Sequence, residues 1–111
     1  MKGNELFKVA VRSMTDISRE VLEEAGVRAE DVSLFIPHQA NQRITDAVAN
    51  KLDVDDDRVY SNIAMHGNTS SASIPIALDE CVEVGRIKKD DLILLASFGG
   101  GVTWAGVLIR W

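Results

Sequence analysis

The spacing of hydrophobic residues changes several times along the chain, and each spacing predicts one element. Between Asn4 and Gly26 the apolar residues recur at steps of three and four, which predicts a long amphipathic helix. Asn4 is expected to cap the start of this helix, and Gly26 to end it in a left-handed conformation. The residues of the apolar face are Leu6, Phe7, Ala10, Met14, Ile17, Val21 and Ala25.

A short apolar run at residues 32–36 predicts a buried strand that Pro37 ends. Helical spacing then returns from Gln39 to Lys51 and predicts a second helix. Four aspartates follow within residues 53–57. A calcium loop would also need a later glutamate and a turn glycine, so this segment is expected to be a solvated turn.

In the second half of the chain, residues 58–61 favour a short strand and residues 70–84 a third helix. The continuous apolar run 92–96 is typical of a central strand that is buried on both faces. Residues 98–101, with three glycines, predict a sharp turn. The last strand, 102–111, should pair antiparallel with the strand before it.

The predicted order is therefore helix, strand, helix, strand, helix, strand, strand. This order indicates an α/β fold in which a mixed sheet packs against helices, as one domain over residues 1–111. The first helix has no strand before it, although a right-handed α/β layer normally supplies one.

Composition narrows the class of protein. The net charge of −5 over 111 residues argues against a nucleic-acid surface, which needs clustered Lys and Arg. No apolar run approaches the roughly 20 residues of a membrane span, and the first residues lack the apolar segment of a signal peptide. A single cysteine fits a reducing compartment. We expect a soluble, cytoplasmic protein.

Two polar segments, 37–41 and 66–70, lie where apolar runs give way to helical patterns. His38 should lie near a helix N-terminus, which lowers the pKa of its imidazole and favours the neutral ring. Asn68 supplies a second neutral donor, and the 99–101 turn a backbone N–H. Donors converging on one oxygen stabilise an enolate or oxyanion, and one donor contributes about 3 kcal/mol. Taken alone, His38 also fits a capping or core histidine.

Other chemical groups give weaker hypotheses. Cys81 lies on the apolar face of the third helix, which favours burial over nucleophilic work. A zinc site of His38, His66 and Cys81 has no paired ligand spacing. His66 fits a second base or a residue that only holds its loop. Three serines lack the Gly-x-Ser-x-Gly elbow of a nucleophile: Ser70, Ser71 and Ser73.

Three motifs carry a resemblance to a known family. They are the segments Pro37-His38-Gln39-Ala40-Asn41-Gln42-Arg43-Ile44, His66-Gly67-Asn68-Thr69-Ser70-Ser71-Ala72-Ser73 and Phe98-Gly99-Gly100-Gly101-Val102-Thr103-Trp104. In this order the motifs resemble the C-terminal half of β-ketoacyl-acyl-carrier-protein synthase III, a thiolase-superfamily acyltransferase that starts fatty-acid synthesis. The likeness extends from Gly3 to Trp111.

The resemblance implies a decarboxylative condensation of an acyl-CoA with malonyl-acyl carrier protein. His38 and Asn68 would hydrogen-bond the malonyl thioester oxygen and stabilise the enolate. Phe98 would line the site, and Gly100 would give a backbone N–H to the thioester oxyanion. The residues that would receive the pantetheine arm or the carrier protein are Gln39, Ala40, Asn41 and Arg43. No metal and no resident cofactor are implied, because CoA and the acyl-carrier phosphopantetheine carry the substrates.

The chain departs from the family because the nucleophilic cysteine belongs to an N-terminal half, and Cys81 does not match it. The leading interpretation is therefore a catalytic C-terminal half that is inactive alone. Its partners would be the N-terminal half, the acyl carrier protein, a CoA thioester and a second copy in a homodimer. The alternative is a non-catalytic carrier- or CoA-binding or dimerisation module of the same fold. A small hydrolase would need a nucleophile that the sequence does not offer.

The resemblance also implies that the first strand of the half is missing. We expect strands 32–36 and 92–96 to flank the position it leaves empty. Backbone groups left unpaired there would cost roughly 1–3 kcal/mol each. The chain should therefore dimerise, swap elements with a copy of itself, close the two strands together or hold another fragment.

Overall fold

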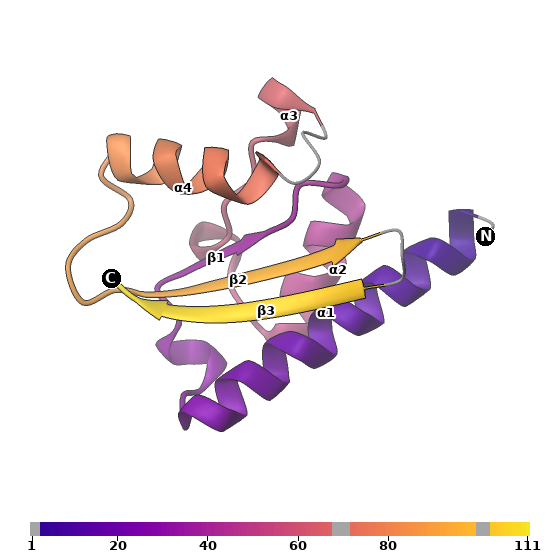
Figure 1. Cartoon of the computed structure of the whole chain (residues 1–111), viewed down its shortest axis with the longest axis horizontal. Coiled ribbons are helices and arrows are strands. Elements are labelled where there is room, and N and C mark those ends of the chain that lie inside the picture. Colours follow the sequence, from indigo (N-terminus) through magenta and orange to yellow (C-terminus); the bar gives the residue numbers. More distant parts are fainter. Residues whose placement is uncertain (1–2, 68–71, 100–102) are drawn as a thin grey trace.

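The computed structural model describes residues 3–67, 72–99 and 103–111. A three-stranded mixed sheet forms the middle of the molecule (Figure 1). Helices α1 (Gly3–Ala25) and α2 (Gln42–Leu52) pack on one face of this sheet, and α4 (Ser73–Glu83) packs on the other. The predicted α/β class is confirmed.

Helix α1 is the long amphipathic helix that the spacing predicts. It begins at Gly3, so Asn4 lies inside the helix, and its predicted role as the N-cap is wrong. Gly26 ends the helix with φ +67°, as predicted. The amide of Val27 then donates to Leu22 O at 3.0 Å, which satisfies a carbonyl at the helix end.

Strands β1 (Leu34–Pro37) and β2 (Leu92–Gly99) pair directly and in parallel, with Leu34 opposite Ile93. The position expected to be empty is therefore closed: of the outcomes expected for the missing strand, the one found is that the two strands close together. Both strands are buried, β1 throughout, and direct pairing satisfies the backbone groups that a gap would leave without partners. The strand also starts two residues later than expected, because Ala29–Asp31 forms a 3-10 turn with Val32 as its C-cap.

Strand β3 (Thr103–Arg110) pairs antiparallel with β2, as predicted. The sheet order is β1-β2-β3, so β2 is central, and within the described residues no strand pairs with the outer side of β3. Phe98 and Gly99 belong to β2 and not to the predicted turn; the turn residues 100–101 lie outside the described residues. The side of β3 that faces α1 carries Gly106.

Helix α2 begins three residues later than predicted because Asn41 caps it. The Asn41 Oδ1 atom accepts from Ile44 N at 2.9 Å, and the extended backbone of Asn41 precedes the first helical turn. At the other end, Asp53 has φ 58° and closes the helix in a left-handed conformation.

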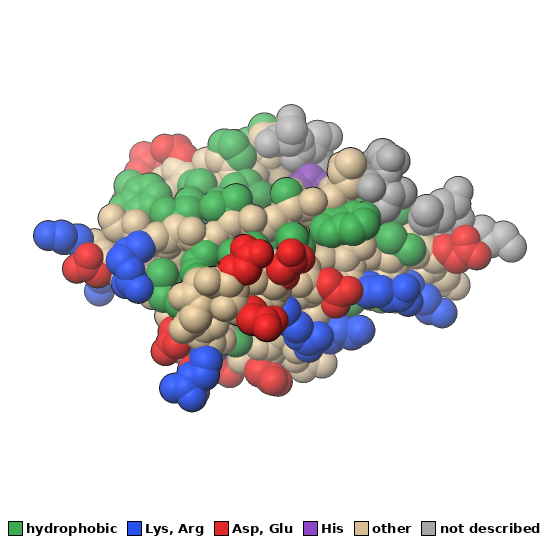
Figure 2. All heavy atoms as spheres, turned by 60° about the horizontal axis from the view of Figure 1, so that its bottom comes forward, with side chains coloured by type: hydrophobic (Ala, Val, Ile, Leu, Met, Phe, Trp, Pro, Cys, Tyr) green, Lys and Arg blue, Asp and Glu red, His purple; other side chains and the backbone are tan. Residues whose placement is uncertain are grey.

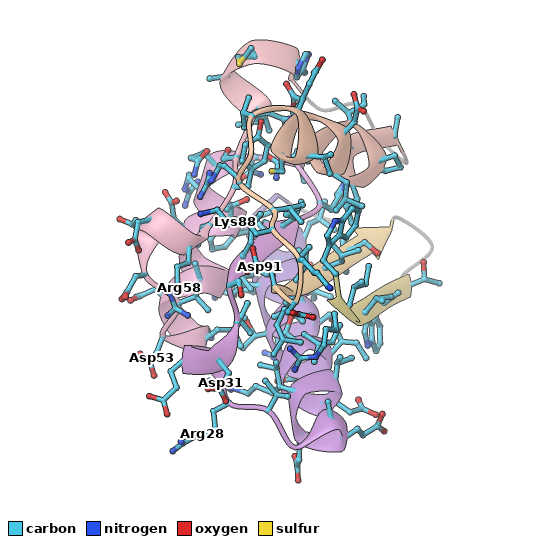
Figure 3. All side chains as sticks on the ribbon, turned by 90° about the vertical axis from the view of Figure 1, so that its left-hand side faces the viewer. Arg28, Asp31, Asp53, Arg58, Lys88 and Asp91 are labelled. Carbon is cyan, nitrogen blue, oxygen red and sulfur yellow. The ribbon has the colours of Figure 1, made fainter. Side chains whose placement is uncertain are left out.

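The acidic segment after α2 is the exposed turn that the sequence predicts, with a 3-10 turn, η2, at Asp56–Arg58. Arg58 extends from this turn and donates to the carbonyls of Ala29, Glu30 and Val32 at 3.1, 3.3 and 2.7 Å. Figure 3 shows Arg58 beside Asp31, which lies in this carbonyl-bearing segment. The guanidinium thus fixes the entry into β1.

The predicted strand 58–61 is reduced to one parallel bridge, between Val59 and Phe35. Tyr60 N also donates to Phe35 O at 2.9 Å, so the segment follows β1 for one residue and then leaves it. A helical turn that the sequence did not indicate, α3 (Ile63–His66), comes next. In place of the third predicted helix, 70–84, the structure has α4 at Ser73–Glu83, preceded by Ala72 as its N-cap; residues 68–71 lie outside the described residues.

Two hydrophobic clusters hold the layers together. The larger lies under α1 and α2 and includes Phe35 and Leu94; the smaller lies under α4 and includes Ile36 and Ile93. None of the helices in the described residues is long and apolar enough to cross a membrane. Figure 2 shows hydrophobic side chains in a band across one face, beside mixed acidic and basic side chains.

Candidate functional site

His38 directly follows the last residue of β1, at the point where the chain leaves the sheet. Its backbone N donates to Ala96 O at 2.7 Å, so the turn out of β1 is held by β2. The ring is half-buried, and burial lowers the pKa of the His38 imidazole below 6.5. The sequence also predicted a lowered pKa for His38, but it attributed the lowering to a helix N-terminus, whereas the cause is desolvation by burial. The ring is therefore neutral at neutral pH and can donate from one nitrogen.

Ser73 lies against the His38 ring at the start of α4. The Ser73 Oγ atom is 2.7 Å from His38 Nδ1, and it also accepts from Gln39 N at 3.3 Å. Ser73 is 1% exposed. The sequence suggested Ser73 only as a nucleophile without its elbow, and its contact with His38 was missed. No short-range pattern signals this contact, because 35 residues separate the partners.

The buried side chain of Gln39 holds the loop that follows β1 by hydrogen bonds. Its side chain is 1% exposed, and its Nε2 donates to Pro37 O at 2.7 Å and to Tyr60 O at 3.3 Å. Its Oε1 accepts from Asn62 N at 3.0 Å. Three hydrogen bonds of the Gln39 amide therefore serve this internal network, and one acceptor lone pair of Oε1 is left over. The buried amide of Gln39 thus fixes the loop that carries His38, and its contact with a carrier protein or CoA stays a prediction.

The other residues of the first motif lie nearer the surface. Ala40 is half-buried, and its N donates to His38 O at 3.0 Å. Asn41 is exposed, but its side-chain oxygen is engaged as the cap of α2. Arg43 is exposed, and its guanidinium lies 4.8 Å from the centroid of the Phe7 ring. Arg43 thus offers a positive charge at the start of α2.

Phe98 lies near the end of β2, on the same edge of the sheet as His38. It is partly buried and packs against the cluster under α1. The parallel register places Pro37 opposite Ala96, so the carboxyl ends of β1 and β2 point to the same edge of the sheet, and β2 continues past β1 to Gly99. Two predicted site residues, Asn68 and Gly100, lie outside the described residues, and their approach to His38 stays a prediction.

His66 contacts Glu80 of α4. Its Nε2 lies 3.0 Å from Glu80 Oε2, and Glu80 Oε1 accepts from Asn62 Nδ2 at 2.6 Å. The hydrogen bond from Asn62, followed by that from His66, lowers the pKa of the Glu80 carboxyl below 4.5. Of the two roles open to His66, this contact supports the one in which it holds its loop.

Cys81 is fully buried, as predicted. Desolvation raises the pKa of its thiol to about 11, which opposes nucleophilic work. Among the described residues, no group of three or more His, Cys, Asp and Glu side chains is placed to hold a metal ion.

Comparison with known proteins gives one consistent family. Residues 22–111 match the family described as 3-oxoacyl-[acyl-carrier-protein (ACP)] synthase III C terminal. The chain is 60% identical over 111 residues to beta-ketoacyl-[acyl-carrier-protein] synthase III of Aquifex aeolicus, covering 100% of this chain and 36% of the relative. It is 56% identical to the protein of the same name from Roseiflexus castenholzii, covering 34% of it.

Solved structures agree with the sequence comparison. The crystal structure of 3-oxoacyl-[acyl-carrier-protein] synthase III from Aquifex aeolicus superposes with a TM-score of 0.98 at 59% identity, covering 100% of this chain and 36% of that chain. The synthase III from Pseudomonas aeruginosa gives 0.96 at 45% identity, covering 100% and 35%. The chain thus spans about a third of the length of the relatives that it matches.

Proposed function

The chain belongs to the 3-oxoacyl-[acyl-carrier-protein] synthase III C-terminal family, and from this we propose that it stabilises the enolate in a decarboxylative condensing enzyme. The observation that carries the proposal is the neutral, half-buried His38 at the common edge of β1 and β2. An uncharged imidazole N–H there can donate to an oxygen on which negative charge develops.

The proposed step begins with a malonyl thioester whose carbonyl oxygen accepts from His38. The bond to the carboxylate carbon breaks, carbon dioxide leaves, and the electron pair moves onto the thioester oxygen as an enolate. Asn68 is proposed as the second donor to this oxygen. The enolate carbon then forms a bond to the carbonyl carbon of an acyl thioester, and the thiolate of that thioester leaves. Gly100 N–H would stabilise the oxyanion formed there, and Phe98 would shield the pocket from water.

The proposed docking surface for the acidic carrier protein and the CoA arm begins at Arg43. This charge is exposed and stacked on Phe7, which keeps it near the start of α2. Asn41 fixes the same helix terminus as its cap. Gln39 contributes by holding the loop and Ala40 by its place in it.

The acyl-carrying cysteine must come from the remaining two thirds of the enzyme, which we propose as the first partner of this chain. Apolar side chains remain exposed on α4 and β3, namely Val82 at 47%, Val107 at 49% and Trp104 at 49%. Val107 shares with Ile109 the face that looks toward α4, and this face is covered only in part. These side chains are proposed to pack against the remainder of the enzyme, which by family resemblance would be a cytoplasmic homodimer.

A chimera tests the proposal. The Aquifex aeolicus relative receives this chain in place of its own matching 111 residues, which are 60% identical. We expect the chimera to condense an acyl-CoA primer of the Aquifex aeolicus relative with malonyl-acyl carrier protein. Replacing His38 or Asn68 by Ala should slow decarboxylation by about a hundredfold each, the usual effect of one lost oxyanion donor.

The controls separate catalysis from folding. The same chimera with Gln42→Ala changes an exposed residue of α2 and should keep its activity. A folded chimera whose decarboxylation rate does not depend on His38 would overturn the proposed chemistry. In that case the alternative, a carrier-binding or dimerisation module, would be tested by binding of malonyl-acyl carrier protein.

A further inference from the structure

We propose that Ser73 is a positioning residue that fixes the tautomer of His38, by donating its hydroxyl proton to Nδ1 so that Nε2 carries the ring proton. The inference adds to the proposed function, and the value of this tautomer for catalysis rests on that function. An enolate oxygen needs an N–H donor, and the correct nitrogen must carry the proton before substrate arrives.

The first argument is the distance. Ser73 Oγ lies 2.7 Å from His38 Nδ1, the length of a well-formed hydrogen bond to a hydroxyl. One of the two atoms supplies the proton, so the contact permits two arrangements. In one, the serine donates and Nε2 is protonated; in the other, Nδ1–H donates and Nε2 is a bare acceptor.

The second argument comes from the neighbouring amide. Gln39 N donates to the same Ser73 Oγ at 3.3 Å, so one acceptor position of the hydroxyl is already used. If Nδ1–H donated as well, the oxygen would accept twice and its own proton would need another acceptor in a buried place. Donation to Nδ1 instead gives every group in the Gln39–Ser73–His38 chain a role.

The surroundings also favour a neutral ring, which leaves a lone pair on one nitrogen to accept from the serine. His38 is half-buried, Ser73 in contact with its ring is the first residue of α4, and α2 begins four residues after His38. The positive ends of the helix dipoles oppose an imidazolium there. Lowering of the His38 pKa by burial acts in the same direction.

Nitrogen-15 NMR of the imidazole tests the proposal on this chain without any substrate. Two-bond correlations distinguish a protonated from an unprotonated ring nitrogen. We expect the Nε2-protonated form of His38 to exceed the other by about tenfold or more, a ratio worth about 1.4 kcal/mol. In Ser73→Ala the ratio should fall several-fold. Ser18→Ala, which also removes a buried serine hydroxyl, should leave the ratio unchanged.

The pKa of His38 gives a second reading with a definite sign. A hydroxyl that donates to Nδ1 stabilises the neutral ring, so its removal in Ser73→Ala should raise the measured pKa. A hydroxyl that accepts from Nδ1–H would stabilise the charged ring, and its removal would lower the pKa. Ser73→Gly provides the same test if the alanine variant does not fold.

An Nδ1-protonated ring in the original chain, or a tautomer ratio and pKa that Ser73→Ala does not change, would overturn the proposal. The same variant in the chimera separates this result from the proposed function. If the tautomer shifts but decarboxylation is unchanged, the assignment of Ser73 stands and the catalytic use of His38 fails. If both change, with kcat lowered more than KM is raised, both stand.

Discussion

Glu80 Oε2 lies 3.0 Å from His66 Nε2, and this contact joins α4 to α3 on either side of the segment that contains Asn68. Glu80 accepts at its other oxygen from Asn62, the residue that precedes α3. The backbone of Asn62 is in turn bound by Gln39, the neighbour of His38. The two motifs are therefore connected through a chain of hydrogen bonds.

The first prediction concerns Glu80 and acid. Its folded-state pKa is lowered, mainly by the hydrogen bond from Asn62, so its contribution to stability is present above its ordinary pKa of 4.5. This contribution is lost as the pH falls through the lower folded-state value. Glu80→Gln should lose less stability than the original chain between about pH 5 and pH 3. Urea unfolding at a series of pH values measures this, with exposed Glu83→Gln as control. Identical pH slopes in all three proteins would contradict it.

The second prediction concerns His38 at milder pH. Burial lowers its pKa in the folded chain, so the unfolded chain binds its proton more readily. Stability should therefore fall as the pH drops below 6.5 and level off below the folded-state pKa. His38→Asn should flatten this part of the profile. An unchanged slope between about pH 7 and pH 5 would show that His38 does not carry the effect.

The third prediction concerns the buried amide of Gln39. Gln39→Leu removes the acceptor of Asn62 N and the donor to Pro37 O and Tyr60 O. Because Asn62 is 4% exposed, its N–H would be left without water, and we expect a loss of about 3 kcal/mol in the free energy of unfolding. The exposed change Gln42→Leu should cost much less. Equal losses in urea unfolding would refute the structural role of Gln39.

The spacing of apolar residues predicted the helices and strands well, because that spacing follows from which side chains of each element are buried. The α1 face and the β2 run 92–96 are determined by burial, which reads directly as apolar spacing. Apolar spacing did not predict where the elements begin and end, because single side chains determine these boundaries. Asn41 caps α2 and delays its start, a detail that the flanking hydrophobic pattern does not contain.

Sheet order and side-chain contacts were harder to predict because they join distant residues. A continuous apolar run such as β2 indicates burial on both faces but does not identify the neighbouring strands. The gap beside β1 was expected from the family resemblance, and the local sequence could not decide that the two strands would close together. The Ser73–His38 contact spans 35 residues and likewise leaves no local trace. His38 was identified because it follows the proline that ends a strand and precedes a helix, a position that the sequence does show.

The fourth prediction is that the Cys81 thiol reacts slowly in the folded chain. The side chain is fully buried, and with a pKa of about 11 only about one thiol in ten thousand is ionised at pH 7. Modification should follow opening of the fold and accelerate in urea. Val82→Cys in a Cys81→Ala background is the matched control, because position 82 is 47% exposed. Equal labelling rates at the two positions would refute the burial of Cys81.

The fifth prediction tests how α1 seats against β3. A Cβ atom at Gly106 would lie 3.1 Å from Ile17 Cγ1 and 3.2 Å from Val21 Cγ2, closer than ordinary contact. Both neighbours are β-branched and have few alternative rotamers in a helix, so α1 itself must move. Gly106→Val should therefore reduce the free energy of unfolding by about 2 kcal/mol. Ala105→Val adds two methyl groups to the adjacent, exposed position on the opposite face of the strand, where β propensity favours valine. Urea unfolding that finds the two variants equally stable would mean that α1 does not approach β3 this closely.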